Sequence, residues 1–515
     1  SGRRLRLSDR DGRPVHVVVA PGSPDDPRDG LRVQTLVVVE NDAVGRARWD
    51  AGSRVLHVVR PAPAPVAPEA YGPFLERVVT DGGNISRTGL EDDPSAVTTA
   101  TLNSSWHPTE DLAIRMAARN VDARSQYDNV DYIVTGLPAD SDVELDTTQR
   151  YAQLAVIAGS DDAKLRHRFA AHHLDSENRN RTDGIDDVAA LSDRLTLSYQ
   201  ADLRIGPDTL SLALEREETN FEQRGQIGFG DPNQVQSMSV DSLVVDYQGS
   251  IGEDVSWLAS ARYDDNSDFD DALTGRLAIA WQATERTVVR LSGGTGQKNP
   301  TFIELYGYFP GQFVNNPVLE PEQSTSVDVG IEQQLGAQLN LQFTAFRQDL
   351  ENEINGFVYD PITFLATADN MAGTSRRDGI EVALRWDPTD TLTAGASYTY
   401  VDSRADDVRE VRRPRHSGSL DLDLALLEGR AHVVLAAAYG GSRTDVFFPP
   451  WPNPPETVAL ASHWLADLTV RYQVSPTVGL FARVANLLDT EYEQVYGYRM
   501  PGRTVYAGVT AAFAR

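Results

Sequence analysis

The sequence predicts an all-β protein, a transmembrane antiparallel β-barrel of about twenty-two strands. Three observations favour this fold. Segments of roughly ten residues alternate apolar and polar side chains from Ala96 onward, as barrel strands do. Full charges stand in the middle of the polar faces, and short turns alternate with long polar loops along the chain. Helical periodicity is hard to find anywhere.

The N-terminal 68 residues form a separate segment whose fold the sequence leaves open. Residues 1–68 hold 11 Arg against 8 Asp plus Glu, whereas the whole chain has a net charge of −28. The run "RPAPAPVAP" at residues 60–68 is typical of a stiff, polyproline-like linker, so we place the domain boundary there and assign residues 69–515 to the barrel.

Three apolar runs in the first segment allow two interpretations. They are "VHVVVA", "VQTLVVV" and "RVLHVV". Added to the roughly nineteen alternating segments between Ala96 and Phe513, they would complete a barrel of about twenty-two strands. Their apolar residues fall on both faces, however, which suits a buried sheet better, so both interpretations stay open.

The alternation is clearest in "LADLTVRYQV", residues 465–474. Ala466, Leu468, Val470, Tyr472 and Val474 share one face, and Asp467, Thr469, Arg471 and Gln473 share the other. The segments "IEVALRWD" and "DRLTLSYQA" repeat the pattern. A soluble sandwich or propeller would turn such apolar faces into a core, whereas a membrane barrel turns them toward lipid around a polar lumen. Mid-strand charges such as Asp467 and Arg471 favour the wet lumen.

The connections and the last strand support the barrel. Short turns such as "DPTDT" and "EGR" alternate with long loops such as "SRADDVREVRRPRH" and "GSRTDVFFPPWPNPPET". Residues 503–513 alternate again, with Val505, Ala507, Val509, Ala511 and Phe513 on one face. We expect this strand to pair with the first one, because closure removes the exposed sheet edges, and its apolar face to meet lipid.

Composition excludes several classes of function. The acidic balance, with a pI near 4.7, argues against a nucleic-acid partner, which would call for a basic patch. Cysteine is absent, so there is neither a disulfide frame nor a thiolate metal site. No apolar run reaches the ~18–20 residues of a membrane-spanning helix. No Gly-x-Ser-x-Gly or His-Glu-x-x-His motif occurs, and we predict that the protein is not an enzyme.

Three motifs in order along the chain resemble the barrel of a TonB-dependent outer-membrane receptor. They are "SGGTGQKNPTFIELYGYFPGQFVNNPVLEPEQSTSVDVGIEQ", "GIEVALRW" and "VANLLDTEYEQVYGYRMPGRTVYAGV", and the resemblance spans most of residues 85–513. Within that family, "ARYDDNSDF", "IELYGYFPG" and "EYEQVYGY" are most similar to the vitamin B12 (cobalamin) transporters. Ferric-siderophore and haem receptors share much of the same barrel.

The resemblance implies a receptor in the outer membrane of a Gram-negative bacterium, in contact with the lipid bilayer. It would take up a scarce nutrient, with cobalamin favoured, using energy from the TonB complex. The ligand would be a corrinoid or a ferric chelate, and TonB would be a partner if "VQTLVVVEN" serves as a TonB box. The alternatives are a ferric-siderophore or haem receptor, or a passive pore or remnant barrel. The plug domain of the family is not recognisable in residues 1–68, so the sequence predicts a missing or truncated plug.

The candidate ligand-binding residues lie in "ELYGYFPGQFVNNP", which we interpret as an extracellular loop. They are Tyr306, Tyr308, Phe309, Phe313 and Asn315. The alternative is a loop packed on itself, or aromatic residues of the membrane girdle. No organic cofactor is predicted.

Calcium is the one ion for which the sequence offers candidate ligands. Carboxylates of two acidic runs, "DGIDD" and "YDDNSDFDD", could supply oxygen atoms. The candidates are Asp183, Asp186, Asp187, Asp264 and Asp265. The resemblance to cobalamin transporters, which use calcium to order outer loops, supports this hypothesis, whereas solvated loop tips are the plain alternative.

Overall fold

A computed structural model describes residues 84–511 of the protein, except 88, 228–229, 317, 361, 364 and 477. Before residue 81 it describes five strands: β1 (Leu7–Ser8), β2 (Pro14–Val15), β3 (Arg46–Asp50), β4 (Val55–Val59) and β5 (Phe74–Thr80). The predictions for the linker at 60–68, for the TonB-box-like run at 33–41 and for Phe513 lie outside the described residues.

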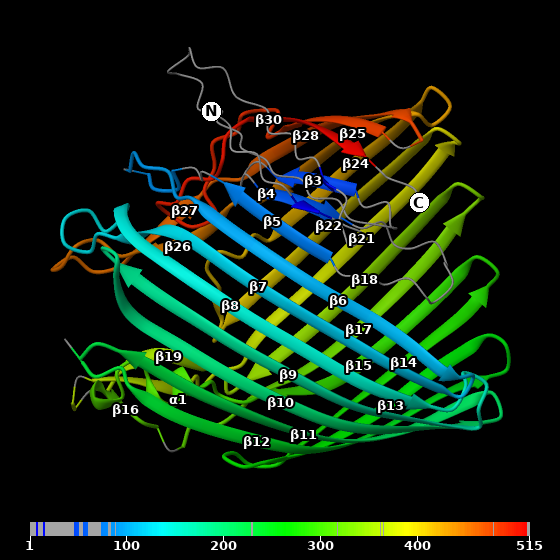
Figure 1. Ribbon diagram of the computed structural model, residues 1–515, viewed down its shortest axis with the longest axis horizontal. Helices are drawn as coiled ribbons and strands as arrows, with labels where there is room; N and C mark the ends of the chain where they lie inside the picture. The colour runs from blue at the N-terminus through cyan, green and yellow to red at the C-terminus, as the bar shows by residue number, and fades with distance from the viewer. Residues whose placement is uncertain are drawn as a thin grey trace.

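A single large antiparallel sheet dominates the molecule and closes on itself as a barrel (Figure 1). Its strands after β5 are β6 (Ser95–Thr109), β7 (Leu112–Val130), β8 (Pro138–Ala158), β9 (Leu165–Thr182), β10 (Ile185–Ile205), β11 (Asp208–Gly225), β12 (Gln234–Ile251), β13 (Val255–Asn266), β14 (Ala272–Thr284), β15 (Thr287–Lys298), β17 (Glu322–Leu335), β18 (Leu339–Glu351), β21 (Ser375–Thr389), β22 (Leu392–Ala405), β24 (His416–Leu426), β25 (Ala431–Gly440), β28 (His463–Ser475), β29 (Val478–Ala485) and β30 (Thr504–Ala511). The two-residue β23 (Val408–Arg409) adds to the end of β22. The strand order places the last strand, β30, beside β5, as closure requires.

Leaving out the two-residue β23, nineteen barrel strands lie between β6 and β30, and they confirm the number of about nineteen expected between Ala96 and Phe513. In the described part of the chain β5 brings the count to twenty, or to twenty-one with β23, slightly below the expected total of about twenty-two. The run "RVLHVV" does form β4, but β4 pairs with β3 in a separate hairpin instead of joining the barrel. The strand that completes the sheet, β5, was not among the predicted ones.

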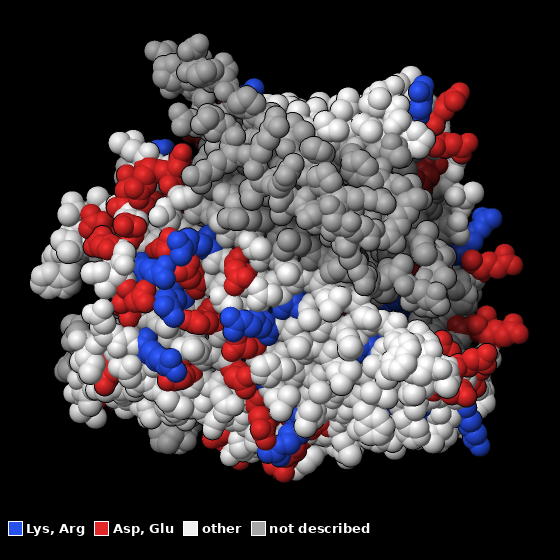
Figure 2. All heavy atoms as spheres, viewed as in Figure 1, with Lys and Arg blue, Asp and Glu red and all other residues white. Residues whose placement is uncertain are grey.

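The two faces of the barrel wall follow the predicted alternation. In β28, Leu468 lies opposite Leu435 on one side and Val484 on the other. Residues directly opposite each other in antiparallel strands share a face, so these side chains form one apolar row. In β30, Val505 and Val509 are exposed, as expected for side chains that face lipid rather than a core. Figure 2 shows uncharged atoms over much of the lower right of the visible wall, with charged side chains at its left and right ends and in a band that runs to the lower edge.

The inner face carries hydrogen-bonded charges. Arg290 of β15 donates to Glu332 of β17 at 2.7 Å, and His432 of β25 lies 2.9 Å from Asp423 of β24. Since these residues alternate with exposed apolar ones along the same strands, the polar face lines the lumen. The prediction of a polar interior is confirmed for these strands.

The two ends of the barrel differ in the length of their connections. At one end tight turns join the strands, and Gly206, Gly252 and Gly336 adopt positive φ there, which glycine does without strain. At the other, the long-loop end, lie residues 299–321, 352–374, 406–415, 441–462 and 486–503. The remaining elements belong to this end: α1 (Phe302–Tyr306), a 3₁₀ turn η1 (Pro310–Gln312), β16 (Phe313–Val314), β19 (Ile354–Tyr359), β20 (Ala366–Asn370), β26 (Arg443–Phe447) and β27 (Glu456–Leu460). Among the described residues no helix is long and apolar enough to span a membrane.

Candidate functional site

Two long loops fold together as one unit at the long-loop end. In this paired-loop unit, residues 299–321 and 352–374, β16 pairs in parallel with β20, and β20 pairs with β19. Thr301 starts α1 with a capping box, because its hydroxyl accepts from the Glu304 N–H and the Glu304 carboxylate accepts from the Thr301 N–H. Phe313, Leu319 and Ala368 form a small buried core. The loops therefore hold a defined shape.

Two buried glutamines anchor the paired-loop unit to the barrel wall. The Gln223 side chain, only 1% exposed, donates to the carbonyl of Tyr308 at 2.7 Å and to that of Pro232 at 2.9 Å. Gln234 donates to the carbonyl of Gly307 at 2.9 Å. Buried amides that satisfy loop carbonyls hold the chain in place, because leaving either group unpaired costs about 1–3 kcal/mol. The turn around Tyr308 is therefore fixed over β11 and β12.

The structure distributes the five predicted ligand-binding residues over different environments. Phe313, 9% exposed, belongs to the core of the paired-loop unit. Tyr306 and Phe309 are half-buried, and a Cβ at Gly230 would lie 2.9 Å from the Phe309 ring. Tyr308, 53% exposed, and Asn315 present their side chains to solvent. Contact with a ligand stays a prediction for all five, and Tyr308 has the most accessible aromatic ring of the set.

A second loop cluster, residues 406–415, 441–462 and 486–503, is organised by a buried carboxylate. Asp445 is fully buried and accepts from the Arg412 guanidinium at 2.7 Å. Its oxygens also accept from the backbone N–H groups of Val446 and Tyr496, each at 2.8 Å. One side chain thus joins all three segments. Sequence reasoning missed it, since no local motif marks Asp445.

The same cluster is tied to the segment between β5 and β6. Arg87 forms a two-pronged ion pair with Glu493 and lies over the Tyr496 ring, 4.4 Å from its centroid. Ser86 and Tyr498 form an isolated β-bridge. The sequence motif "EYEQVYGY" contains Glu493, Tyr496 and Tyr498, so the motif fastens the last long loop beside the seam of the barrel.

Loop 406–415 contacts the inner face of the barrel wall through Glu410. The Glu410 carboxylate accepts from Arg377 at 3.0 Å and also from the Ser403 hydroxyl. By strand alternation both of these partners face the lumen. The exposed side chains of Arg409 and Arg413 give this loop accessible positive charge.

The predicted calcium ligands do not converge. Asp186 is paired with Arg181 at 2.8 Å, and Asp264 accepts from Arg262 at 2.8 Å. Asp264 and Asp265 are neighbours in one strand and point to opposite faces. Asp183 and Asp187 are exposed near the β9–β10 hairpin, several strands away from β13. Calcium at these five residues stays a prediction that the geometry does not favour.

Comparison with known proteins finds relatives with the same β-barrel fold. Residues 46–487 match the family model described as TonB dependent receptor-like, beta-barrel. The structure is similar to the siderophore receptor PirA from Acinetobacter baumannii, with 16% identity, a TM-score of 0.67, and 85% of this chain and 74% of that chain covered. The structure is also similar to the FrpB iron transporter from Neisseria meningitidis, with 13% identity, a TM-score of 0.69, and 85% of this chain and 76% of that chain covered. The copper transporter OprC is similar with 16% identity, a TM-score of 0.68, and 86% of this chain and 75% of that chain covered.

At such identities the solved structures show the fold alone, whereas the family model covers most of the chain. Members of this family are outer-membrane proteins of Gram-negative bacteria, and they are transporters rather than enzymes. The long-loop end therefore corresponds to the outside of the cell, where such barrels carry their longer loops. The chain belongs to the TonB-dependent receptor-like β-barrel family of outer-membrane proteins.

Proposed function

We propose that the protein is a receptor that captures a small metal chelate at its outer loops and passes it inward with energy from TonB. The observation that carries this proposal is the folded state of the outer loops. A passive pore needs only an open mouth, whereas the paired-loop unit has its own core and buried anchors at Gln223 and Gln234. Such preorganisation lowers the entropic cost of binding a ligand.

Among the outer loops, loop 406–415 carries more Arg than acidic residues, and this loop favours an anionic chelate as ligand. Arg409 and Arg413 are exposed in a loop that leans over the lumen, although the chain as a whole is strongly acidic. A guanidinium group binds carboxylate or phenolate oxygens through charge-assisted hydrogen bonds. Similar structures include receptors for siderophores, iron and copper, which supports a chelate of a transition metal.

Cobalamin is the second candidate. It rests on the likeness of "ARYDDNSDF", "IELYGYFPG" and "EYEQVYGY" to cobalamin transporters. The likeness concerns motifs in loops and strand ends, and "IELYGYFPG" contains the exposed Tyr308. Direct binding measurements separate the two candidates.

The test is a binding titration of the purified chain in detergent with ferric catecholate and hydroxamate chelates, haem and cyanocobalamin. We expect saturable binding of a ferric chelate, weakened roughly 5- to 30-fold in Tyr308→Ala, because an exposed aromatic anchor contributes about 1–2 kcal/mol. Trp106→Ala, an exposed aromatic residue near the turn end of the barrel, is the matched control and should bind as the wild type does. Binding of cyanocobalamin alone would make cobalamin the ligand, and no binding together with steady ion conductance would support a passive pore.

A further inference from the structure

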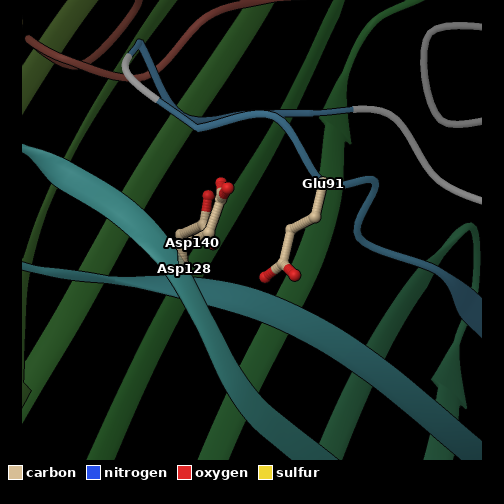
Figure 3. A group of neighbouring side chains, drawn as sticks. All are labelled: Glu91, Asp128 and Asp140. Carbon is tan, nitrogen blue, oxygen red and sulfur yellow. The ribbon is translucent and has the colours of Figure 1, made fainter.

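Three carboxyl groups from separate parts of the chain meet at the long-loop end (Figure 3). Asp128 lies near the end of β7, Asp140 near the start of β8, and Glu91 in the segment that leads from β5 to β6. Ligand oxygen atoms of the three groups all lie within 4.8 Å of one another. Among the described residues, no other set of three acidic or His side chains meets this geometry.

Asp128 is what distinguishes this group from an ordinary acidic surface. The residue is only 3% exposed, and neither of its carboxylate oxygens has a hydrogen-bond partner of normal geometry. Within the part of the chain that the structure describes, no ion pair includes Glu91, Asp128 or Asp140. Burying an unpaired carboxylate costs several kcal/mol in general. A cation bound beside Asp128 would offset this cost.

We propose that Glu91, Asp128 and Asp140 bind a calcium ion that fastens the β5–β6 segment to the ends of β7 and β8. The ligand set consists of carboxylate oxygens alone, which suits a hard cation and disfavours zinc or copper. Ca²⁺ takes six to eight oxygen ligands in a flexible geometry, whereas Mg²⁺ usually keeps several waters and binds only one or two carboxylates. The three oxygen atoms lie within 4.8 Å of one another, close enough for one Ca²⁺ ion to contact all of them.

The surroundings of the three carboxylates add negative charge rather than relieving it. The next two residues after Glu91 are also acidic, and the carboxylates of Asp92 and Asp93 accept only from the Asn84 and Ile85 N–H groups among the hydrogen bonds of the described residues. A divalent cation in the middle of the group would remove this repulsion.

The backbone of the β5–β6 segment lies close to the Asp140 carboxylate. The Leu90 N–H donates to both oxygens of Asp140, at 3.0 and 2.8 Å. A Cβ at Gly89 would lie 1.8 Å from an Asp140 oxygen, so a larger residue there would have to displace the Asp140 carboxylate. The same segment carries Ser86 and Arg87, which contact Tyr498 and Glu493. A bound ion would therefore also steady the last long loop beside the barrel seam.

The test is a calcium titration of the chelator-stripped full chain, followed by calorimetry and by protease cleavage within residues 84–94. We expect the wild type to bind Ca²⁺ and to become at least tenfold slower to cleave in that segment. Asp128→Asn should weaken Ca²⁺ binding at least tenfold without a loss of stability in the metal-free state, because the substitution removes a buried charge. Glu91→Gln, at an exposed position where folding is not at risk, should also weaken binding.

Asp92→Asn serves as the matched control, because Asp92 is the neighbouring acid and lies outside the group. It should bind Ca²⁺ as the wild type does. The proposal is overturned if the wild type binds no Ca²⁺, if Asp128→Asn and Glu91→Gln bind it unchanged, or if Mg²⁺ protects the segment equally well. None of these readouts depends on the transported ligand, so the calcium site and the proposed function can fail separately.

Discussion

Leu468→Arg is expected to destabilise the barrel in the membrane by about 2–4 kcal/mol. Leu468 stands midway along β28, four residues from Trp464 and four from Tyr472, with Leu435 and Val484 beside it on the lipid face. Arginine at the bilayer midplane of a barrel costs about 2–4 kcal/mol. The measurement is folding into lipid vesicles, followed by urea unfolding of the inserted protein.

The control places the same new charge on the inner face. Thr399 of β22 lies opposite Glu381 of β21 and faces the lumen by strand alternation, so Thr399→Arg should fold with nearly wild-type stability. If both substitutions had the same effect, or if Leu468→Arg were neutral, the assignment of the apolar face to lipid would be wrong.

The second large effect is expected at Asp445, whose loss should loosen the second loop cluster. Asp445→Ala leaves two backbone N–H groups and the Arg412 guanidinium without their acceptor. Unpaired buried groups cost about 1–3 kcal/mol each, but Arg412 is half-exposed and can turn to water, so we expect a local loss on the order of 3 kcal/mol. Hydrogen exchange of the backbone amides of residues 441–462 and 486–503 measures this local loss of stability.

Glu456→Ala is the matched control for this prediction. Glu456 carries the same charge type on the adjacent β27, but its side chain is exposed. Exchange should rise roughly a hundredfold in Asp445→Ala, following about 3 kcal/mol of lost stability, and stay unchanged in Glu456→Ala. Equal exchange in both variants would mean that Asp445 does not hold the loops together.

The barrel wall could be predicted from the sequence because its signal is local. A strand with one face in lipid repeats every two residues, so segments such as residues 465–474 disclose both their structure and their orientation. The strand β5 escaped prediction because "FLERVVT" is short and adjoins a Pro-rich stretch. Pairing partners and sheet closure depend on contacts across the whole chain, which no single segment encodes.

The candidate site was harder to predict for the same physical reason. An aromatic loop that binds a ligand and one that packs on itself have the same composition, and only the fold separates buried Phe313 from exposed Tyr308. The acidic runs suggested calcium at neighbouring residues, yet Asp264 and Asp265 point to opposite faces. The carboxylates that do converge, Glu91, Asp128 and Asp140, are spread over separate segments and carry no motif.

Uptake of a labelled ferric chelate by cells that carry the protein in their outer membrane tests the proposed function most directly. The measurement compares cells with and without a working TonB complex. We predict uptake that saturates at low chelate concentration, stops without TonB and weakens in Tyr308→Ala. Uptake that rises linearly with concentration and persists without TonB would contradict the account and identify the barrel as a passive pore.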